Sequence, residues 1–314
     1  MNKFYLFVVV LLTSQVQQCQ NPGYTQSEIE SSEYWVDVDY VGDQIKGHML
    51  DIHLPRTGEP PFPIIVCIYG SAWFSNNSKT TTFSSGLGQR LLKEGFAVVS
   101  INHRSSSDAK FPAQIQDVKA AIRFIRANSS AFWLDSNFIG ITGWSSGGHL
   151  SALTGTTNGL KSTTINGLNV DIEGNLGTFT QASSSVHAVV DWFGPTDFLI
   201  IDSCGSSFKH DKENSPESSL IGGPLQENKG KVALANPISY AHRNNPPFLI
   251  FHGDKDASVP HCQSERLYSK LQQEGVRSEL VIIAGGQHHS GVMIEKNYIK
   301  MIAFFKKELE SLKK

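Results

Sequence analysis

A serine between glycines is the first feature of this chain that could carry out chemistry. The sequence Gly143-Trp144-Ser145-Ser146-Gly147-Gly148 follows an apolar run, Phe138 to Thr142, and precedes a helical stretch, His149 to Leu153. Strand, G-x-S-x-G and helix are typical of a nucleophile elbow, a turn so tight that small residues must flank the serine. The alternative is a glycine-rich helix start without chemistry. The flanking strand and helix favour Ser145 as a nucleophile.

A serine hydroxyl is a weak nucleophile at neutral pH, so this interpretation requires a histidine as base and a carboxylate that orients it. Two late apolar runs are followed by suitable residues. Asp256 comes after the run Phe248 to Phe251, and His288 comes after Leu280 to Ile283. The order serine, acid, histidine is the one expected for an elbow of this kind. The sequence therefore predicts that Ser145, Asp256 and His288 form a catalytic triad.

Both loops contain a second residue of the same type. Asp254 lies close to Asp256, but the usual position of the acid, three residues beyond the glycine of the loop, favours Asp256 and leaves Asp254 as a turn residue. His288 is preferred over its neighbour His289. The remaining histidines are expected to be hydrogen-bonded structural residues, among them His103, His149 and His252.

Acyl transfer also needs backbone N–H groups that already point at the developing oxyanion. One comes from the residue after the nucleophile, here Ser146, and others come from the loop after an early strand. The early run Ile64 to Ile68 leads into Tyr69-Gly70-Ser71-Ala72-Trp73, where small residues allow a close approach of the backbone. Ser71, Ala72 and Ser146 are therefore the expected donors. The alternative for the early loop is an ordinary Gly-Ser turn.

These residues must be positioned by strands. Two stretches of alternating character, Tyr34 to Tyr40 and His48 to Leu54, predict an antiparallel hairpin. Short apolar runs rich in β-branched residues, typical of buried parallel strands, then recur at Ile64 to Ile68, Phe96 to Ile101, Phe138 to Thr142, Val186 to Trp192, Phe248 to His252 and Leu280 to Ile283.

Helical periods separate the apolar runs. The clearest follows Pro112 and places four side chains on one face, Ile115, Val118, Ile122 and Ile125. Further periods cover Leu87 to Leu92, Ser264 to Leu271 and residues 294–305. Strands that alternate with helices indicate an α/β fold. We predict a mostly parallel central sheet with an N-terminal antiparallel hairpin and helices on both faces.

Composition excludes several classes of function. With 39% hydrophobic and 18% charged residues, the chain of 314 residues is too apolar to be disordered. Its net charge of −2 does not indicate binding to nucleic acid or to an anionic membrane surface. No His or Cys cluster has the spacing of metal ligands, and acyl transfer needs no cofactor, so neither a metal nor an organic cofactor is expected.

The N-terminus has the layout of a secretory signal, which we assign to residues 1–20. Lys3 precedes an apolar run, Phe4 to Leu12, of about nine residues, whereas about 20 are needed to span a bilayer. We expect a secreted or periplasmic protein without a transmembrane segment in its mature form. Cys19 is a candidate for a lipid anchor, although Gln17 and Gln18 occupy sites where lipoprotein signals favour small residues.

The mature chain, residues 21–314, is expected to form a single catalytic domain. Two stretches break the alternation, at about residues 156–185 and 203–246, and are expected to be loop insertions at the strand ends. Export would place three cysteines in an oxidising compartment. Cys67 lies in an apolar run and is expected to be buried, which leaves Cys204 and Cys262 as a candidate disulfide; two reduced cysteines are the alternative.

From about residue 33 to residue 310, these motifs together resemble the α/β-hydrolase superfamily. Within it, the chain is similar to the hormone-sensitive-lipase-like and acetyl-xylan or feruloyl esterase branch labelled BD-FAE. The resemblance rests on Tyr69 to Trp73 in place of the family's HGGGW, on Phe111 to Gln114 with Asp117 and Arg123, on Gly143 to Gly148, on Asp191 to Asp197, and on the loops of Asp256 and His288. The chain departs from the family at Tyr69, Ser71, Ala72, Trp144 and Ser146.

The resemblance implies a serine carboxylesterase that removes acetyl or feruloyl groups from plant cell-wall xylan, and it leaves the choice between the two acyl groups open. The expected substrate is an ester-substituted carbohydrate or a small ester. Trp73, Trp192 and Phe193 are candidates for the walls of a substrate pocket. The alternatives are a peptidase of the prolyl-oligopeptidase type, for whose extra domain the chain has no room, and a non-catalytic binding protein, which would normally have lost one triad residue.

Overall fold

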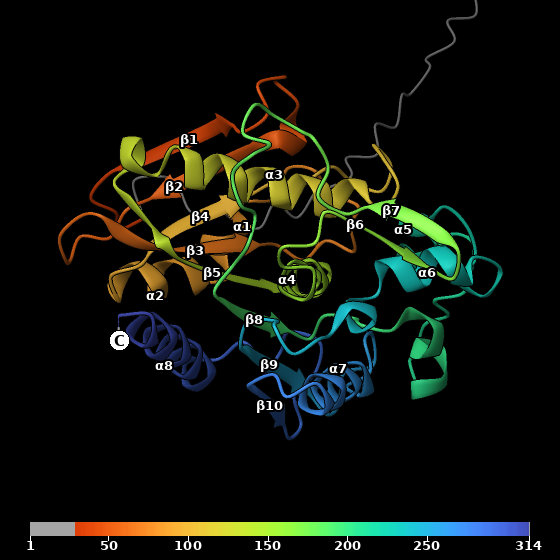
Figure 1. The fold of residues 1–314 in the computed structure, drawn as a ribbon. Coiled ribbons are helices and arrows are strands. Elements are labelled where there is room, and N and C mark those ends of the chain that lie inside the picture. Colours follow the sequence, from red (N-terminus) through yellow and green to blue (C-terminus); the bar gives the residue numbers. More distant parts are fainter. Residues whose placement is uncertain (1–28, 314) are drawn as a thin grey trace, which may run out of the picture.

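The computed structural model describes residues 29–313 and contains an eight-stranded central sheet (Figure 1). Its first two strands pair antiparallel at one edge, and the other six are parallel to one another, as the apolar runs predict. The strands lie in the order β1 (Tyr34–Asp39), β2 (Met49–His53), β4 (Ala97–Ile101), β3 (Phe62–Ile68), β5 (Leu134–Trp144), β8 (Ala188–Trp192), β9 (Phe248–Gly253) and β10 (Ser278–Ile283).

Helices cover both faces of this sheet, because its central strands are apolar on both sides. Along β3, Ile64, Val66 and Ile68 belong to one buried cluster, whereas Ile65 and Cys67 belong to another. The first cluster is covered by α3 (Ala113–Ala127), α4 (Ser146–Thr156) and α7 (Cys262–Gln273), and the second by α2 (Leu87–Lys93) and α8 (Glu295–Ser311). The predicted mixed sheet of the α/β-hydrolase fold, with helices on both faces, is confirmed.

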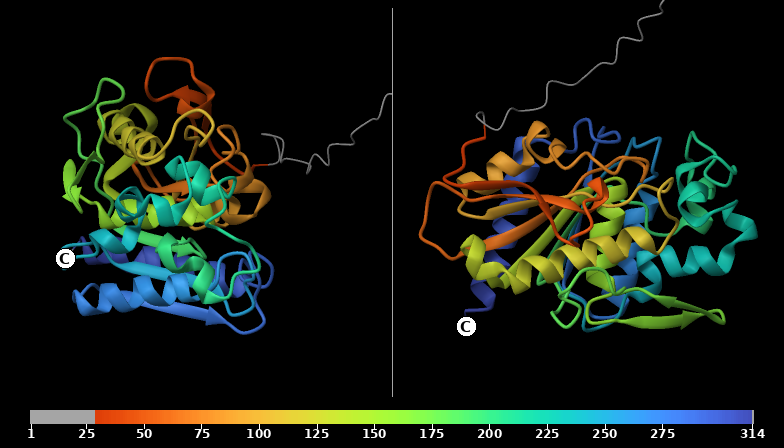
Figure 2. Two further views of the ribbon diagram at one scale, coloured as in Figure 1. Left: turned by 90° about the vertical axis from the view of Figure 1, so that its right-hand side faces the viewer. Right: turned by 90° about the horizontal axis from the view of Figure 1, so that it is seen from above.

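The two stretches without clear periodicity contain short elements that the sequence analysis did not predict. The first includes an antiparallel ribbon, β6 (Ser162–Ile165) and β7 (Leu168–Asp171). The second includes α5 (Pro216–Ile221) and α6 (Lys229–Ala235), and α6 packs against the ribbon. The ribbon lies at the same end of the molecule as α5 and α6 in Figure 1 and in the right-hand view of Figure 2.

The ribbon escaped prediction because most of its side chains are partly or fully exposed and its strands are only four residues long. The sequence did contain a signal for it. Asn166 and Gly167, between the two strands, have φ values of +51° and +77°. An Asn-Gly pair with positive φ at both positions is the turn that two-residue hairpins favour.

The predicted signal peptide, residues 1–20, and Cys19 lie outside the described residues. Among residues 29–313, none of the helices combines the length and the apolar character that crossing a bilayer requires.

One buried histidine ties α4 to the second insertion. His149 is completely buried, and its Nε2 lies 2.8 Å from the carbonyl oxygen of Ala235, which can only accept a hydrogen bond. The ring also packs edge-on against Trp73. Burial lowers the pKa of His149 from 6.5 to about 4, although the bond to Ala235 opposes this shift. The folded protein therefore holds a neutral imidazole where the unfolded chain would bind a proton.

We predict that acidification destabilises the fold through this residue. Between pH 6.5 and about 4 the unfolded chain takes up a proton at His149 that the folded chain does not, so the stabilisation present above pH 6.5 is lost as the pH falls. The free energy of unfolding should fall by about 1.4 kcal/mol per pH unit from this residue alone. Urea unfolding from pH 7.5 to pH 5 measures the slope. His149→Gln should reduce it, and an unchanged slope would contradict the prediction.

Candidate active site

The turn between β5 and α4 places Ser145 in a backbone conformation that L-residues rarely adopt. Its φ and ψ are +55° and −122°. The turn is held because the N–H of Ser145 donates to the carbonyl of Trp192 at 2.9 Å. A Cβ atom on Gly147 would lie 2.2 Å from the carbonyl oxygen of Ile68, and one on Gly143 would lie 2.4 Å from that of Gly147. The close approach of the backbone therefore explains why both positions of the motif are glycine. The strained backbone conformation of Ser145 is of a kind that is typical of functional sites.

The structure brings Ser145, Asp256 and His288 together, as the sequence predicts. Nε2 of His288 lies 3.0 Å from Oγ of Ser145, and Nδ1 lies 2.7 Å from Oδ2 of Asp256. A carboxylate only accepts hydrogen bonds, so Nδ1 carries the proton and Nε2 is free to accept the proton of the serine. The Asp256 side chain is completely buried, whereas that of His288 is 28% exposed. The arrangement connects a buried charge to a nucleophile that faces solvent.

Asp256 stays ionised because the folded chain supplies it with donors. Its Oδ1 accepts hydrogen bonds from the N–H groups of Ser258 and Val259, both at 2.9 Å. Burial by itself raises the pKa of Asp256, but hydrogen bonds from His252 and His288 outweigh this effect and hold the pKa well below its usual value. A carboxylate that remains charged can orient the imidazole and stabilise the imidazolium formed during catalysis.

The sequence analysis gave His252 a purely structural part, yet its ring contacts the buried acid. Nε2 of His252 lies 3.3 Å from Oδ2 of Asp256 and 2.7 Å from the carbonyl oxygen of Val259. Its Nδ1 lies 2.7 Å from Oγ of Ser264, on α7. The position of His252 at the end of β9, four residues before the acid, is the signal that could have indicated this contact.

Asp254, the alternative acid, has a different position. Its Oδ1 accepts a hydrogen bond from the N–H of Gly285 at 2.7 Å, so it ties the acid loop to the loop that carries the histidine. The neighbour of the base, His289, has a φ of +73° and accepts bonds from the N–H groups of Val292 and Met293 through its carbonyl. Both residues therefore shape the turns around the triad.

The expected oxyanion donors differ from one another in the structure. Ser146 is the first residue of α4, where backbone N–H groups have no partner within the helix. Ala72 has a φ of +52°, in the left-handed region that favours glycine. The N–H of Ser71, however, donates to Oγ of Ser146 at 2.9 Å. The prediction for Ser71 is therefore corrected, because its amide is already engaged, whereas Ala72 and Ser146 remain candidate donors.

The prediction that three aromatic residues line the substrate pocket is wrong for two of them. Trp192 and Phe193 are completely buried and do not line the cavity at Ser145. Trp192 stacks on Phe251 with ring centroids 4.2 Å apart, and Phe193 packs against the His288 ring at 4.8 Å. Trp73 does line the cavity, although it is only 1% exposed. The other two aromatic rings support the sheet and the base instead of contacting a substrate.

The cavity at Ser145 has a volume of about 460 Å³. One wall carries Ser145, His288 and the early loop at Ala72. Another part of the wall comes from the second insertion, between Phe208 and Glu217, where the sequence analysis named no site residue. Apart from the length of the insertion after β8, nothing in the sequence indicated this wall, because it forms only through tertiary contacts.

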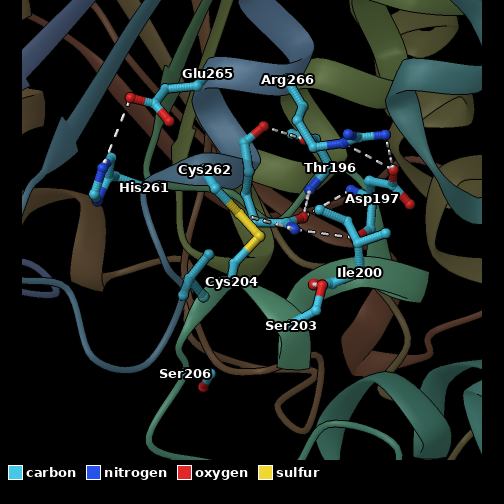
Figure 3. Close-up of a disulfide and its surroundings, with 12 residues drawn as sticks. Thr196, Asp197, Ile200, Ser203, Cys204, Ser206, His261, Cys262, Glu265 and Arg266 are labelled. Atoms are coloured by element: carbon cyan, nitrogen blue, oxygen red, sulfur yellow. Dashed lines mark hydrogen bonds and ion pairs between the residues drawn. A yellow bond between two sulfur atoms is a disulfide. The ribbon is translucent and has the colours of Figure 1, made fainter.

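A disulfide joins this insertion to α7, as Figure 3 shows. Cys204 ends a short helix, Phe198–Cys204, and Cys262 begins α7; their Cα atoms lie 6.2 Å apart. The structure therefore pairs the two cysteines that the sequence analysis selected, and Cys67 is buried and free. Within the described part of the chain, no three His, Cys, Asp or Glu side chains are grouped so that they could hold a metal ion.

Comparison with known proteins places this geometry in a family. The BD-FAE family model matches residues 50–271. The chain belongs to the BD-FAE family. It is similar to the esterase LipQ of Mycobacterium tuberculosis, with 29% identity over 228 residues, which cover 73% of this chain and 50% of LipQ. The chain thus spans about half the length of the curated relatives it matches.

Two solved structures are more similar in sequence than these curated relatives. A truncated carbohydrate esterase from gut microbiota is 45% identical with a TM-score of 0.86, and the match covers 90% of this chain and 98% of that one. A bifunctional GH43-CE protein of Bacteroides eggerthii is 52% identical with a TM-score of 0.83, over 88% of this chain and 35% of that one. These similarities support a carboxylic ester hydrolase.

We predict that the two aspartates of the acid loop have unequal importance. Asp256→Asn removes the charge that orients His288 and should lower kcat for p-nitrophenyl acetate on the order of 10²–10⁴-fold. In Asp254→Asn the amide oxygen can still accept the Gly285 N–H, so kcat should stay within about twofold of the wild type. Steady-state kinetics of the two variants decide the matter, and a larger loss for Asp254→Asn would contradict the assignment.

Proposed function

We propose that this BD-FAE protein is a secreted serine carboxylesterase that removes acetyl or feruloyl groups from plant cell-wall polysaccharide such as xylan. The observation that carries the proposal is the continuous hydrogen-bonded path from Asp256 through His288 to Ser145, which ends in an open cavity. A scaffold that only binds ligands has no need to keep this path intact. The esterase relatives favour ester over peptide hydrolysis.

The geometry supports a two-step mechanism. Nε2 of His288 takes the proton of Ser145 as Oγ attacks the ester carbonyl carbon, and the N–H groups of Ala72 and Ser146 stabilise the oxyanion. His288 then gives this proton to the leaving alcohol, which leaves an acyl group on Ser145. In the second step His288 removes a proton from water, the hydroxide attacks the acyl carbon, and the carboxylic acid is released as Ser145 recovers its proton. Asp256 stabilises the imidazolium in both steps.

The carbohydrate part of the proposal is supported by the relatives and by the chain itself. Two similar solved structures are described as a carbohydrate esterase and as a bifunctional GH43-CE protein. An exported enzyme can reach a polymer outside the cell, and the signal-like N-terminus and the disulfide are both typical of exported proteins.

We predict that Ser145→Ala lowers kcat for p-nitrophenyl acetate on the order of 10⁴–10⁶-fold, because the acyl-enzyme can no longer form. The variant should unfold at nearly the same temperature as the wild type, since only an Oγ atom is lost. Mass spectrometry of wild-type protein quenched during turnover should find the acetyl group on the peptide that contains Ser145. Residual activity within tenfold of the wild type, or an acyl group on another residue, would refute the mechanism.

A further inference from the structure

The mouth of the active-site cavity carries an exposed aromatic ring that the catalytic mechanism does not use. Phe208 is 58% exposed and lines the same cavity as Ser145 and His288. Trp73, which also lines this cavity, is almost completely buried. A large apolar side chain at the entrance of a cavity offers its face to whatever lies outside the reacting bond.

The backbone before Phe208 is fixed to the acid loop. Cys204 is joined covalently to Cys262, and Figure 3 shows how this bond holds the start of the insertion against α7. Both the N–H and Oγ of Ser207 donate to the carbonyl of Ala257 at 2.8 Å. Oγ of Ser206 accepts the N–H of Phe208 at 3.1 Å. The ring is therefore exposed on a backbone whose position is determined by the residue that follows Asp256.

The backbone after Phe208 is fixed by a buried histidine. Nδ1 of His210 lies 2.8 Å from Oε2 of Glu217, and both side chains are almost completely buried. Nε2 of His210 lies 3.1 Å from the carbonyl oxygen of Ser258. The backbone N–H of His210 donates to Oδ1 of Asp202 at 2.8 Å. Phe208 is thus held between two anchored segments, which lowers the entropy lost when a ligand packs on its ring.

We propose that Phe208 is a binding subsite for a sugar ring in the alcohol part of the ester; this inference rests on the proposed function. The reacting carbonyl must lie between Ser145 Oγ and the N–H groups of Ala72 and Ser146, deep in the site. His288 gives its proton to the leaving alcohol, so the alcohol lies on the His288 side of the site. The segment that carries Phe208 is bonded to the carbonyls of Ala257 and Ser258, next to the acid that holds His288. This placement assigns the ring to the alcohol part of the ester.

The chemistry around Phe208 fits a polyhydroxylated ring better than a simple alkyl group. The face of a pyranose that carries C–H groups is apolar and packs on the π-face of an aromatic ring. Lys209, Lys212 and Asn214 are exposed beside it and also line the cavity. Their N–H groups can donate to hydroxyl oxygens at the edge of the sugar. An apolar platform with donors around it thus selects for carbohydrate alcohols.

The test compares methyl acetate with xylose tetraacetate, whose acetyl groups are carried by methanol and by a xylose ring respectively, with initial rates of acid release followed in a pH-stat. Phe208→Ala should lower kcat/KM for xylose tetraacetate by about 5–30-fold, mainly through KM, because the stacking contact is lost. Its kcat/KM for methyl acetate should stay within about twofold, since methanol does not reach the ring. Phe208→Trp should restore sugar-ester activity.

Phe74→Ala is the matched control, because Phe74 is 49% exposed but does not line the cavity, so both esters should be hydrolysed as by the wild type. Equal losses of Phe208→Ala on both esters would show that the ring only supports the fold of the site and would overturn the proposal. No loss on either ester, or a wild type that does not prefer the sugar ester, would also overturn it. Failure of the proposed function is a separate result, in which the wild type hydrolyses neither ester.

Discussion

At Ser145 the chain turns from strand to helix with a backbone φ of +55°, and the turn is stable only because its neighbours come unusually close. The carbonyl of Ile68 lies where a side chain on Gly147 would have to be, and the carbonyl of Trp192 accepts the Ser145 N–H. The elbow therefore packs directly against the ends of β3 and β8. The same contact places the loop after β3, with Ala72, beside the nucleophile, so one steric constraint determines where the oxyanion donors lie.

Two buried carboxyl groups near this elbow show how the fold chooses protonation states. Asp256 receives hydrogen bonds from two backbone N–H groups and from His288, with His252 beside it, and its pKa is lowered. Asp191, at the end of β8, accepts only the N–H of Gly194 among residues 29–313, and burial raises its pKa to about 7. Burial is the same kind of penalty in both cases. The two histidines beside Asp256, which Asp191 lacks, keep the carboxylate of the acid loop charged.

Much of the architecture could be predicted because the central strands are buried on both faces and therefore appear as continuous apolar runs. The triad could be predicted because its three members lie in the loops that follow three apolar strands, β5, β9 and β10. Other features depend on contacts between distant segments and leave no local pattern. Trp192 and Phe193 are aromatic residues of the kind that line pockets, but both lie inside the core. The Ser71 N–H donates to the side chain of Ser146, 75 residues away. The true wall at Phe208 belongs to a polar insertion without periodicity.

The attachment of the insertion to the acid loop has a consequence for how this protein can be altered, by evolution or by design. Residues 204–210 are joined to residues 257–262 by a disulfide and by hydrogen bonds to the carbonyls of Ala257 and Ser258. To replace the mouth of the cavity with that of a relative, residues 204–210 and 257–262 would therefore have to be exchanged together. Exchange of the insertion alone would leave Cys262 without a partner and remove support from the residues that hold Asp256.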